Sequence, residues 1–219
     1  MDDNIRFSQH LQAIIDEVNQ IFEAKNSIRD LTLQRSRELI RYCANSIRAI
    51  QRGDTTESRE LLQTARDIAA EMIVEAQIYP DVYHAGYTQD ALKELAEAYL
   101  TQAIILEEPL PSPEAILNIE PAVYLNGLAE AAGELRRFTL DALRRGEVAQ
   151  AEKILARMDD IYSVLIIVDF PSAITGGLRR TTDMVRGVLE RTRGDVTTAV
   201  RQEAMKAALQ SFEQRIGLE

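Results

Sequence analysis

The chain has 219 residues, of which 46% are hydrophobic and 27% charged, and a net charge of −10 at pH 7. This composition excludes a disordered chain, and the length suffices for one large domain with a substantial core. No run approaches the roughly 18 uncharged apolar residues of a membrane span, and the N-terminal MDDNIRFSQH is acidic and polar, so we expect neither a membrane span nor a secretory signal. Cys43 has no second cysteine to pair with, and it lies on an apolar helix stripe where we expect a buried, inert thiol. We therefore expect a cytoplasmic protein with no membrane partner.

Helical patterns follow one another along the chain, and no alternating strand pattern interrupts them. Residues 3–52 contain neither Gly nor Pro and repeat apolar residues at helical spacing, so we expect one very long helix or two in near continuity. The later expected elements are a helix capped by Asp54 and ending near 77, a loop over 79–87, a helix over 88–107, a break over 107–113, a short helix over 113–118, and helices over 121–146, 148–168, 172–193 and 196–216. The sequence thus predicts an all-α, single-domain bundle of about seven helices over residues 1–219.

Two pairs of glutamates stand at one-turn spacing on two of these helices. Glu94 and Glu97 lie in LKELAEAYLTQAII, and Glu130 and Glu134 lie in YLNGLAEAAGEL. Residues three or four apart share a helix face, so each helix can present two carboxylates side by side. Hard cations such as magnesium, manganese or calcium prefer oxygen ligands of this kind. The alternative is that these glutamates are solvated surface residues.

The helical wheels place both glutamate pairs opposite the main apolar stripe of their own helix. We therefore expect neither pair to lie in the core of its own subunit. The glutamate side of the first helix also carries Ala98, Ile104 and Ile105, which makes it too apolar for an ordinary wet surface. That side is expected to face a subunit interface or an enclosed cavity.

Positive charge is concentrated near the N-terminus despite the negative total. Residues 26–52 contain six arginines against Asp30 and Glu38, whereas residues 53–120 carry fourteen acids against three basic residues. The arginines include a helical stripe at offsets of 4, 11 and 15 residues: Arg37, Arg41, Arg48 and Arg52. Such a stripe can neutralise phosphates, and a solvated face paired with neighbouring acids is the alternative. A second basic cluster over 178–195 is mixed with acids and is expected to be helix surface.

The sequence offers few residues for a histidine-based metal or catalytic site. The two histidines, His10 and His84, are far apart in the sequence, and no Glu-x-x-His motif of a di-iron bundle is present. The remaining candidate chemistry is that of the carboxylates.

Three short runs carry a family resemblance. SIRDLTLQRSRELIR (27–41), LKELAEA (92–98) and YLNGLAEAAGEL (124–135) resemble the translin family, and the branch of translin-associated factor X (Trax) more than translin itself. The resemblance covers residues 5–195, and the stretch from about 196 to 219 looks like a C-terminal helical extension. The resemblance implies a translin-like helical fold that assembles into a hollow homo-octamer with acidic sites facing inward.

The Trax-like resemblance also implies a metal-dependent endoribonuclease. The catalytic glutamate pair of that branch falls on Glu94 and Glu97, and its catalytic aspartate falls on Glu130, which is a departure by one methylene. Glu134 matches an acidic position found in both branches. Glu94, Glu97 and Glu130 would hold magnesium, with manganese as the alternative, and Glu134 would assist catalysis.

RNA is the expected partner, with single-stranded DNA as the alternative. The expected nucleic-acid contacts are Arg29, Arg37, Arg41, Arg48 and Arg52. Two other functions stay open at this point. One is a translin-like octamer that binds single-stranded DNA or RNA without cleaving it, and the other is a helical interaction scaffold with a solvated acidic surface.

Overall fold

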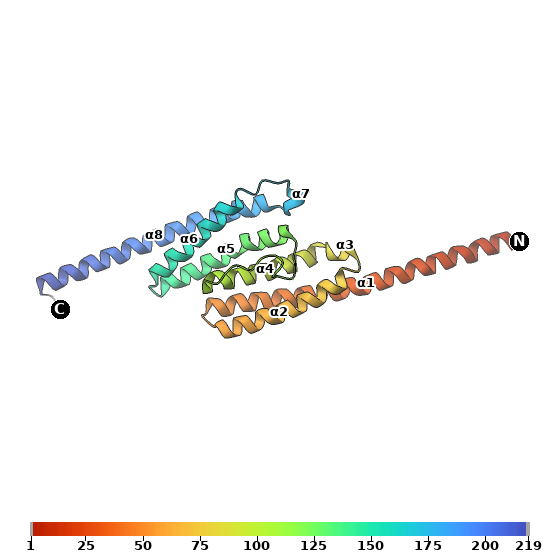
Figure 1. Cartoon of the computed structure of the whole chain (residues 1–219), viewed down its shortest axis with the longest axis horizontal. Helices are drawn as coiled ribbons and strands as arrows, with labels where there is room; N and C mark the ends of the chain where they lie inside the picture. The colour runs from red at the N-terminus through yellow and green to blue at the C-terminus, as the bar shows by residue number, and fades with distance from the viewer. Residues whose placement is uncertain (1, 218–219) are drawn as a thin grey trace.

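The structure, a computed structural model, describes residues 2–217, and within that range it contains helices joined by turns and loops and no strands (Figure 1). The helices in chain order are α1 (Asp2–Gln51), α2 (Thr55–Ala76), α3 (Pro80–Tyr83), α4 (Gly86–Leu106), α5 (Pro121–Arg144), α6 (Val148–Leu165), α7 (Ser172–Thr175) and α8 (Leu178–Ile216). The prediction of an all-α protein is confirmed. No helix among the described residues is long and apolar enough to cross a membrane.

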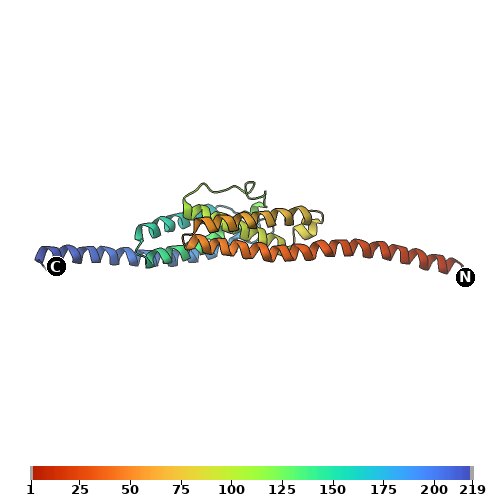
Figure 2. The same cartoon turned by 90° about the horizontal axis from the view of Figure 1, so that it is seen from below.

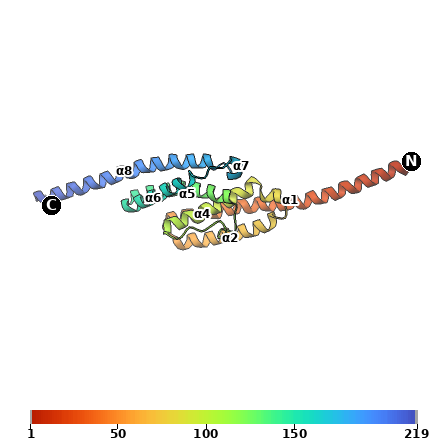
Figure 3. The same ribbon diagram turned by 45° about the horizontal axis from the view of Figure 1, so that its top comes forward.

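The bundle is built around α4 and α5. Helix α1 forms a hairpin with α2 and also contacts α4, while α5 contacts α4, α6 and α8. The α1–α2 hairpin lies along one edge of the bundle and α8 along the other (Figure 3). A long connection between α4 and α5 passes over the bundle (Figure 2). Acidic residues on α4 and α5 are therefore placed in the middle of the molecule, beside α1.

Close approach of α4 and α5 depends on Gly127. A Cβ atom at this position would lie 2.8 Å from the Cβ of Ala96 and 2.9 Å from the backbone oxygen of Lys93, which is too close for any side chain. Glycine at this point of α5 thus allows the two backbones to touch. This contact determines how near the glutamates of one helix lie to those of the other.

Most predicted helices are confirmed, with changes at their ends. Helix α1 is a single helix, and the Asp54 carboxylate accepts a hydrogen bond of 2.9 Å from the backbone NH of Glu57 at the start of α2. The segment 79–87 is not a simple loop, because it contains α3 and the first two residues of α4.

Two helix predictions in the second half of the chain were wrong. Residues 113–118 form turns, which end where Leu117 and Asn118 adopt positive φ angles of 58° and 52°. Gly194 does not divide the last helix, and α8 continues through it because Thr192 and Val196 on either side are buried against the bundle. The chain instead turns at the two adjacent glycines that precede α8, which have φ angles of 59° and 82°.

The two terminal helices extend beyond the bundle at opposite ends (Figure 1). All described side chains in 5–24 of α1 and in 201–215 of α8 are exposed. The α1 overhang nevertheless carries large apolar side chains at spacings of three and four residues: Ile5, Phe7, Leu11, Ile14, Ile15, Val18, Ile21 and Phe22. The α8 overhang carries Met205, Leu209 and Phe212. Each overhang thus has an apolar side that the chain itself does not cover.

Candidate metal centre

Three of the four predicted glutamates meet between α4 and α5. One carboxylate oxygen from each of Glu94, Glu97 and Glu130 can be chosen so that all three lie within 4.8 Å of one another. Oxygen ligands bind Mg²⁺ or Ca²⁺ at about 2.0–2.6 Å, so oxygens at this separation can share one ion. An all-oxygen donor set suits magnesium, calcium or manganese. The triad can therefore hold a divalent cation.

The location of the triad corrects one expectation from the helical wheels. Glu97 is only 8% exposed, and Glu94 and Glu130 are partly buried, all within a single chain. The neighbouring Ala98 and Ile104 are also buried. The glutamate side of α4 packs toward α1 and α5 of its own subunit, so its apolar residues do not require a second subunit to cover them.

Burial and mutual repulsion both act on the triad. Burial, followed by the charges of Glu94 and Glu130, raises the pKa of Glu97 from 4.5 to about 8. Burial also raises the pKa of Glu94, with the charge of Glu130 as the next cause. Near neutral pH, Glu97 is thus mostly protonated when no cation is bound. A divalent ion would offset these charges and displace that proton.

This shift has an expected effect on stability. Below pH 4.5 Glu97 is neutral in both the folded and the unfolded chain. As the pH rises from 4.5 toward about 8, only the unfolded chain releases this proton, so Glu97 lowers the free energy of unfolding across that window, by an amount on the order of a few kcal/mol. We expect the melting temperature of chelator-treated protein to fall over this range and magnesium to restore it near pH 8. Thermal unfolding at a series of pH values, with and without magnesium, measures both effects.

The matched variant for that measurement is Glu97→Gln. It keeps the shape of the side chain but has no proton to lose, so its metal-free melting temperature should fall less with pH than that of the wild type. Equal slopes for the two proteins would contradict the assignment of the titration to Glu97.

Lys93 is a member of this site that was not predicted from the sequence. Its Nζ lies 2.8 Å from Oε1 of Glu130, and both side chains are largely shielded from solvent. Burial, the largest single effect, lowers the pKa of Lys93, but the hydrogen bond to Glu130 and the charges of Glu130, Asp90 and Glu94 together outweigh it, so the net shift is upward. On α4 the spacing i,i+4 would have suggested Glu97 as its partner, and only the packing of α4 against α5 reveals Glu130.

Glu134 lies outside the triad. Its carboxylate accepts a hydrogen bond from Nε2 of Gln51, at the end of α1, while Oε1 of Gln51 is buried and accepts no hydrogen bond from any described residue. Gln51 is 7% exposed. The sequence offered no local signal for this contact, because the two residues are far apart along the chain. Glu134 is thus positioned by α1, and an oxygen without a donor lies beside it.

All five predicted nucleic-acid-binding arginines are exposed: four lie on α1, and Arg52 directly follows its last residue. Four of them have a partner nearby in the chain: Arg29 with Asp30 (2.9 Å), Arg41 with Glu38 (3.3 Å), Arg48 with Asn45 (3.0 Å) and Arg52 with Glu57 (2.8 Å). Arg37 is exposed and has no ion pair within the described residues. Exposed pairs of this kind contribute little energy, so these arginines can exchange their partners for phosphates.

The arginine stripe lies on a side of α1 next to that of Gln51. At 3.6 residues per turn, Arg37 and Arg48 are rotated by only about 40° and 60° around α1 from Gln51, which contacts Glu134. On the other side of the site, Arg137 follows Glu134 by three positions on α5 and is exposed. It lines a groove of about 710 Å³ together with Gly133, Arg136, Leu140, Asp141 and Arg144. The one-turn spacing of Arg137 from Glu134 is the sequence signal that could have indicated it.

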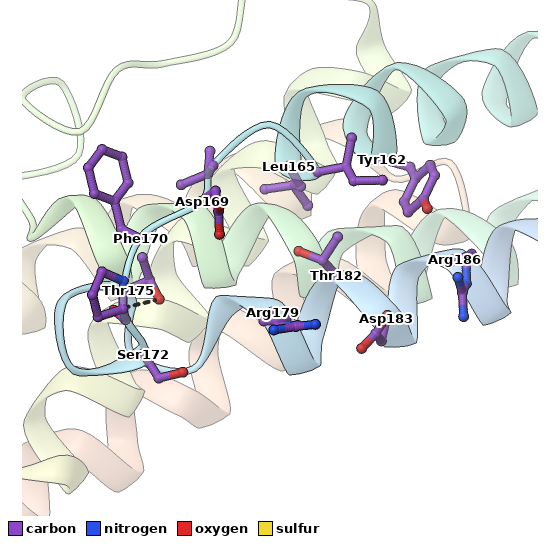
Figure 4. Close-up of a pocket in the computed structure, with 13 residues that line it drawn as sticks. Tyr162, Leu165, Asp169, Phe170, Ser172, Thr175, Arg179, Thr182, Asp183 and Arg186 are labelled. Atoms are coloured by element: carbon purple, nitrogen blue, oxygen red, sulfur yellow. Dashed lines mark hydrogen bonds between the residues drawn. The ribbon is translucent and has the colours of Figure 1, made fainter.

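The second basic cluster borders a different groove, between α6 and α8 (Figure 4). Arg179 and Arg186 line this cavity of about 690 Å³ together with Asp169 and Asp183. Positive and negative side chains thus alternate along it, as the mixed sequence indicated. The triad glutamates do not line it, and it is not part of the candidate metal centre.

Comparison with solved structures identifies the fold. AfC3PO, solved alone and as a complex with duplex RNA, is 33% identical in sequence and has a TM-score of 0.79, over 86% of this chain and 97% of AfC3PO. The chain belongs to the translin/C3PO family. NeC3PO, solved in its apo form, has a TM-score of 0.77 over 84% of this chain and 96% of its own, and at 22% identity it supports the fold alone.

A protein of Methanocaldococcus jannaschii that has not been characterised is also similar. It is 30% identical over 219 residues, which covers 98% of this chain and 96% of that protein. No model of a known protein family matches the sequence. The similarity to AfC3PO and to this archaeal protein extends over nearly the whole of each relative, so the family assignment applies to the entire bundle.

Proposed function

We propose that this translin/C3PO-family protein is a magnesium-dependent endoribonuclease of the Trax-like branch. The observation that carries the proposal is the convergence of Glu94, Glu97 and Glu130, whose carboxylate oxygens come within 4.8 Å of one another. A protein that only binds nucleic acid has no use for three carboxylates gathered in a half-buried site, because they repel both the phosphates and one another. The similarity to AfC3PO, which has been solved with duplex RNA, supports RNA as the substrate.

The residues of the site suit the hydrolysis of a phosphodiester. Glu94, Glu97 and Glu130 would hold magnesium, or manganese in its place, and the ion would supply charge stabilisation and a more acidic water. Glu97 would give up its proton on loading, because burial and the neighbouring charges are what keep that proton in place near pH 7. Glu134, which is held by Gln51, would assist catalysis. The arginines of α1 would bind the phosphates on either side of the cleaved bond, with little preference for base.

A cleavage assay tests the proposal. Labelled single-stranded and duplex RNA are incubated with the protein in magnesium, in manganese and in chelator. We expect internal cleavage with either metal and none with chelator. RNA binding without cleavage under all conditions would favour the alternative, a translin-like octamer that binds single-stranded DNA or RNA without catalysis.

We further propose that the chain assembles into a hollow homo-octamer. The support is the apolar side of the α1 overhang, which repeats large side chains over several turns without any cover from its own chain. Light scattering should give a mass near eight times that of the 24.6 kDa chain. A stable monomer at micromolar concentration would contradict this proposal.

A charge placed on the overhang should disturb assembly without affecting the bundle. Leu11→Glu combined with Val18→Glu is expected to reduce the mass measured by light scattering, because it puts carboxylates into the face that another subunit would cover. The matched control is Gln12→Glu, on a neighbouring position of the same exposed segment. If the double variant keeps the full mass, the α1 overhang is not part of the subunit interface.

A further inference from the structure

The acidic triad already contains a positive charge of its own. Nζ of Lys93 lies 2.8 Å from Oε1 of Glu130, and the two side chains are 21% and 27% exposed. Within residues 2–217, no other lysine or arginine forms an ion pair with any of the three triad glutamates. A single ammonium group thus faces a cluster of three carboxylates.

The backbone holds this lysine in place. The carbonyl oxygen of Lys93 is one of the atoms nearest to Gly127, where α4 and α5 touch. Glu130 lies three positions beyond Gly127 on the same helix, so the lysine side chain runs along α5 for about one turn to reach it. The close contact between the helices thus brings Lys93 and Glu130 within reach of each other.

Lys93 and a divalent cation would need the same carboxylate. Glu130 is one of the three residues whose oxygens can surround an ion, and one of those oxygens already accepts a hydrogen bond from Lys93. Two positive groups on one carboxylate repel each other, more strongly in a half-buried site than in water. In the metal-free protein, however, the lysine offsets part of the repulsion among the glutamates.

We propose that Lys93 is the internal counter-ion of the acidic triad: it stabilises the metal-free site by pairing with Glu130, and it must release Glu130 before a divalent cation can bind. Lys93 is thus a positioning residue that weakens cation affinity. The inference rests on the proposed metal site. Lys93, which does not itself bind the metal, would then set the metal concentration at which the site fills.

The test compares manganese binding by Lys93→Met, which keeps the length of the side chain and removes its charge, with binding by the full-length wild-type protein. Calorimetry, or the electron paramagnetic resonance signal of free Mn²⁺, measures the affinity near pH 7.5. We expect about tenfold tighter binding by the variant, since one competing charge is gone. In chelator, the same variant should melt at a lower temperature than the wild type. Lys93→Arg, which keeps the charge, should stay near wild type in both measurements.

Lys25→Met is the matched control, because Lys25 pairs with Asp81 outside the acidic site. It removes the same charge from an ion pair and should leave manganese affinity unchanged. Lys93→Gln serves as a second neutral variant if Lys93→Met does not fold. Manganese binding by the neutral variants and not by the wild type would support the counter-ion role in its strongest form.

Two results would overturn the inference. If the wild type binds manganese and the neutral variants bind it equally or more weakly, the counter-ion role fails while the metal site stands. If none of these proteins binds manganese, both the metal site and the role of Lys93 fail. Metal-dependent RNA cleavage by the wild type separately measures the proposed function, so the two failures can be told apart.

Discussion

Glu97→Gln is expected to abolish RNA cleavage while RNA binding and assembly persist. Glu97 is the most buried member of the triad, and an amide in its place keeps the shape but removes the charge that would hold a cation. Loss of one group that stabilises developing charge typically lowers the rate on the order of 10²–10³-fold, and loss of the ion itself should lower it further. Single-turnover cleavage of labelled RNA in magnesium measures the effect.

The control for this experiment is Glu60→Gln on the exposed surface of α2. It makes the same chemical change away from the site and should cleave at the wild-type rate. Glu97→Gln should also melt at a higher temperature than the wild type in chelator near pH 8, because it removes a buried acid that is costly to ionise. Wild-type cleavage by Glu97→Gln would show that Glu97 is not in the active site.

The sequence was sufficient for most of the helices and for the members of the triad. Helical periodicity is a local property, so the long α1 and the capped start of α2 could be predicted from their own residues. The triad followed from the one-turn spacing on α4 and from the family resemblance, which paired it with Glu130. The resemblance also indicated the fold that AfC3PO and NeC3PO share with this chain.

The environment of the glutamates could not be predicted in this way. A helical wheel describes one helix, whereas the burial of Glu97 results from the packing of α1 and α5 against α4. The ion pair of Lys93 with Glu130 and the hydrogen bond of Gln51 with Glu134 likewise join separate helices. Each depends on a close approach, such as the one at Gly127, that no periodic pattern encodes.

Glycine has different structural effects inside α8 and just before it. Gly194 is tolerated inside α8 because its neighbours pack into the bundle and the helix gains more from that packing than the glycine costs. Gly176 and Gly177 adopt positive φ angles and do end a helical segment. The helix expected over 172–193 is thus interrupted at Gly176 and Gly177, whereas the boundary expected at Gly194 is absent, because tertiary contacts decide between the two outcomes.

Replacement of Arg37, Arg41 and Arg48 by Gln is expected to weaken RNA binding without changing metal affinity. The three are exposed on α1, on a side next to the one that carries Gln51, which contacts Glu134. Removal of each arginine that binds a phosphate should reduce the slope of log affinity against log salt by about 0.9 for a duplex and about 0.7 for a single strand. Fluorescence anisotropy over a range of salt concentrations, in chelator to prevent cleavage, measures this slope for both kinds of RNA.

A triple variant of equal charge is the control: Arg59, Lys153 and Arg157 are each replaced by Gln. These side chains are also exposed, and each has an ion pair, but they lie on α2 and α6 rather than on α1. If only the total positive charge matters, RNA binding weakens equally in the two variants. If the stripe binds phosphates, the α1 variant binds RNA much more weakly than the control variant. An unchanged salt slope for the α1 variant would mean that its arginines are only a solvated, locally paired surface. The phosphate contacts would then have to lie elsewhere, with Arg179, Arg180 and Arg186 on α8 as the next set to replace.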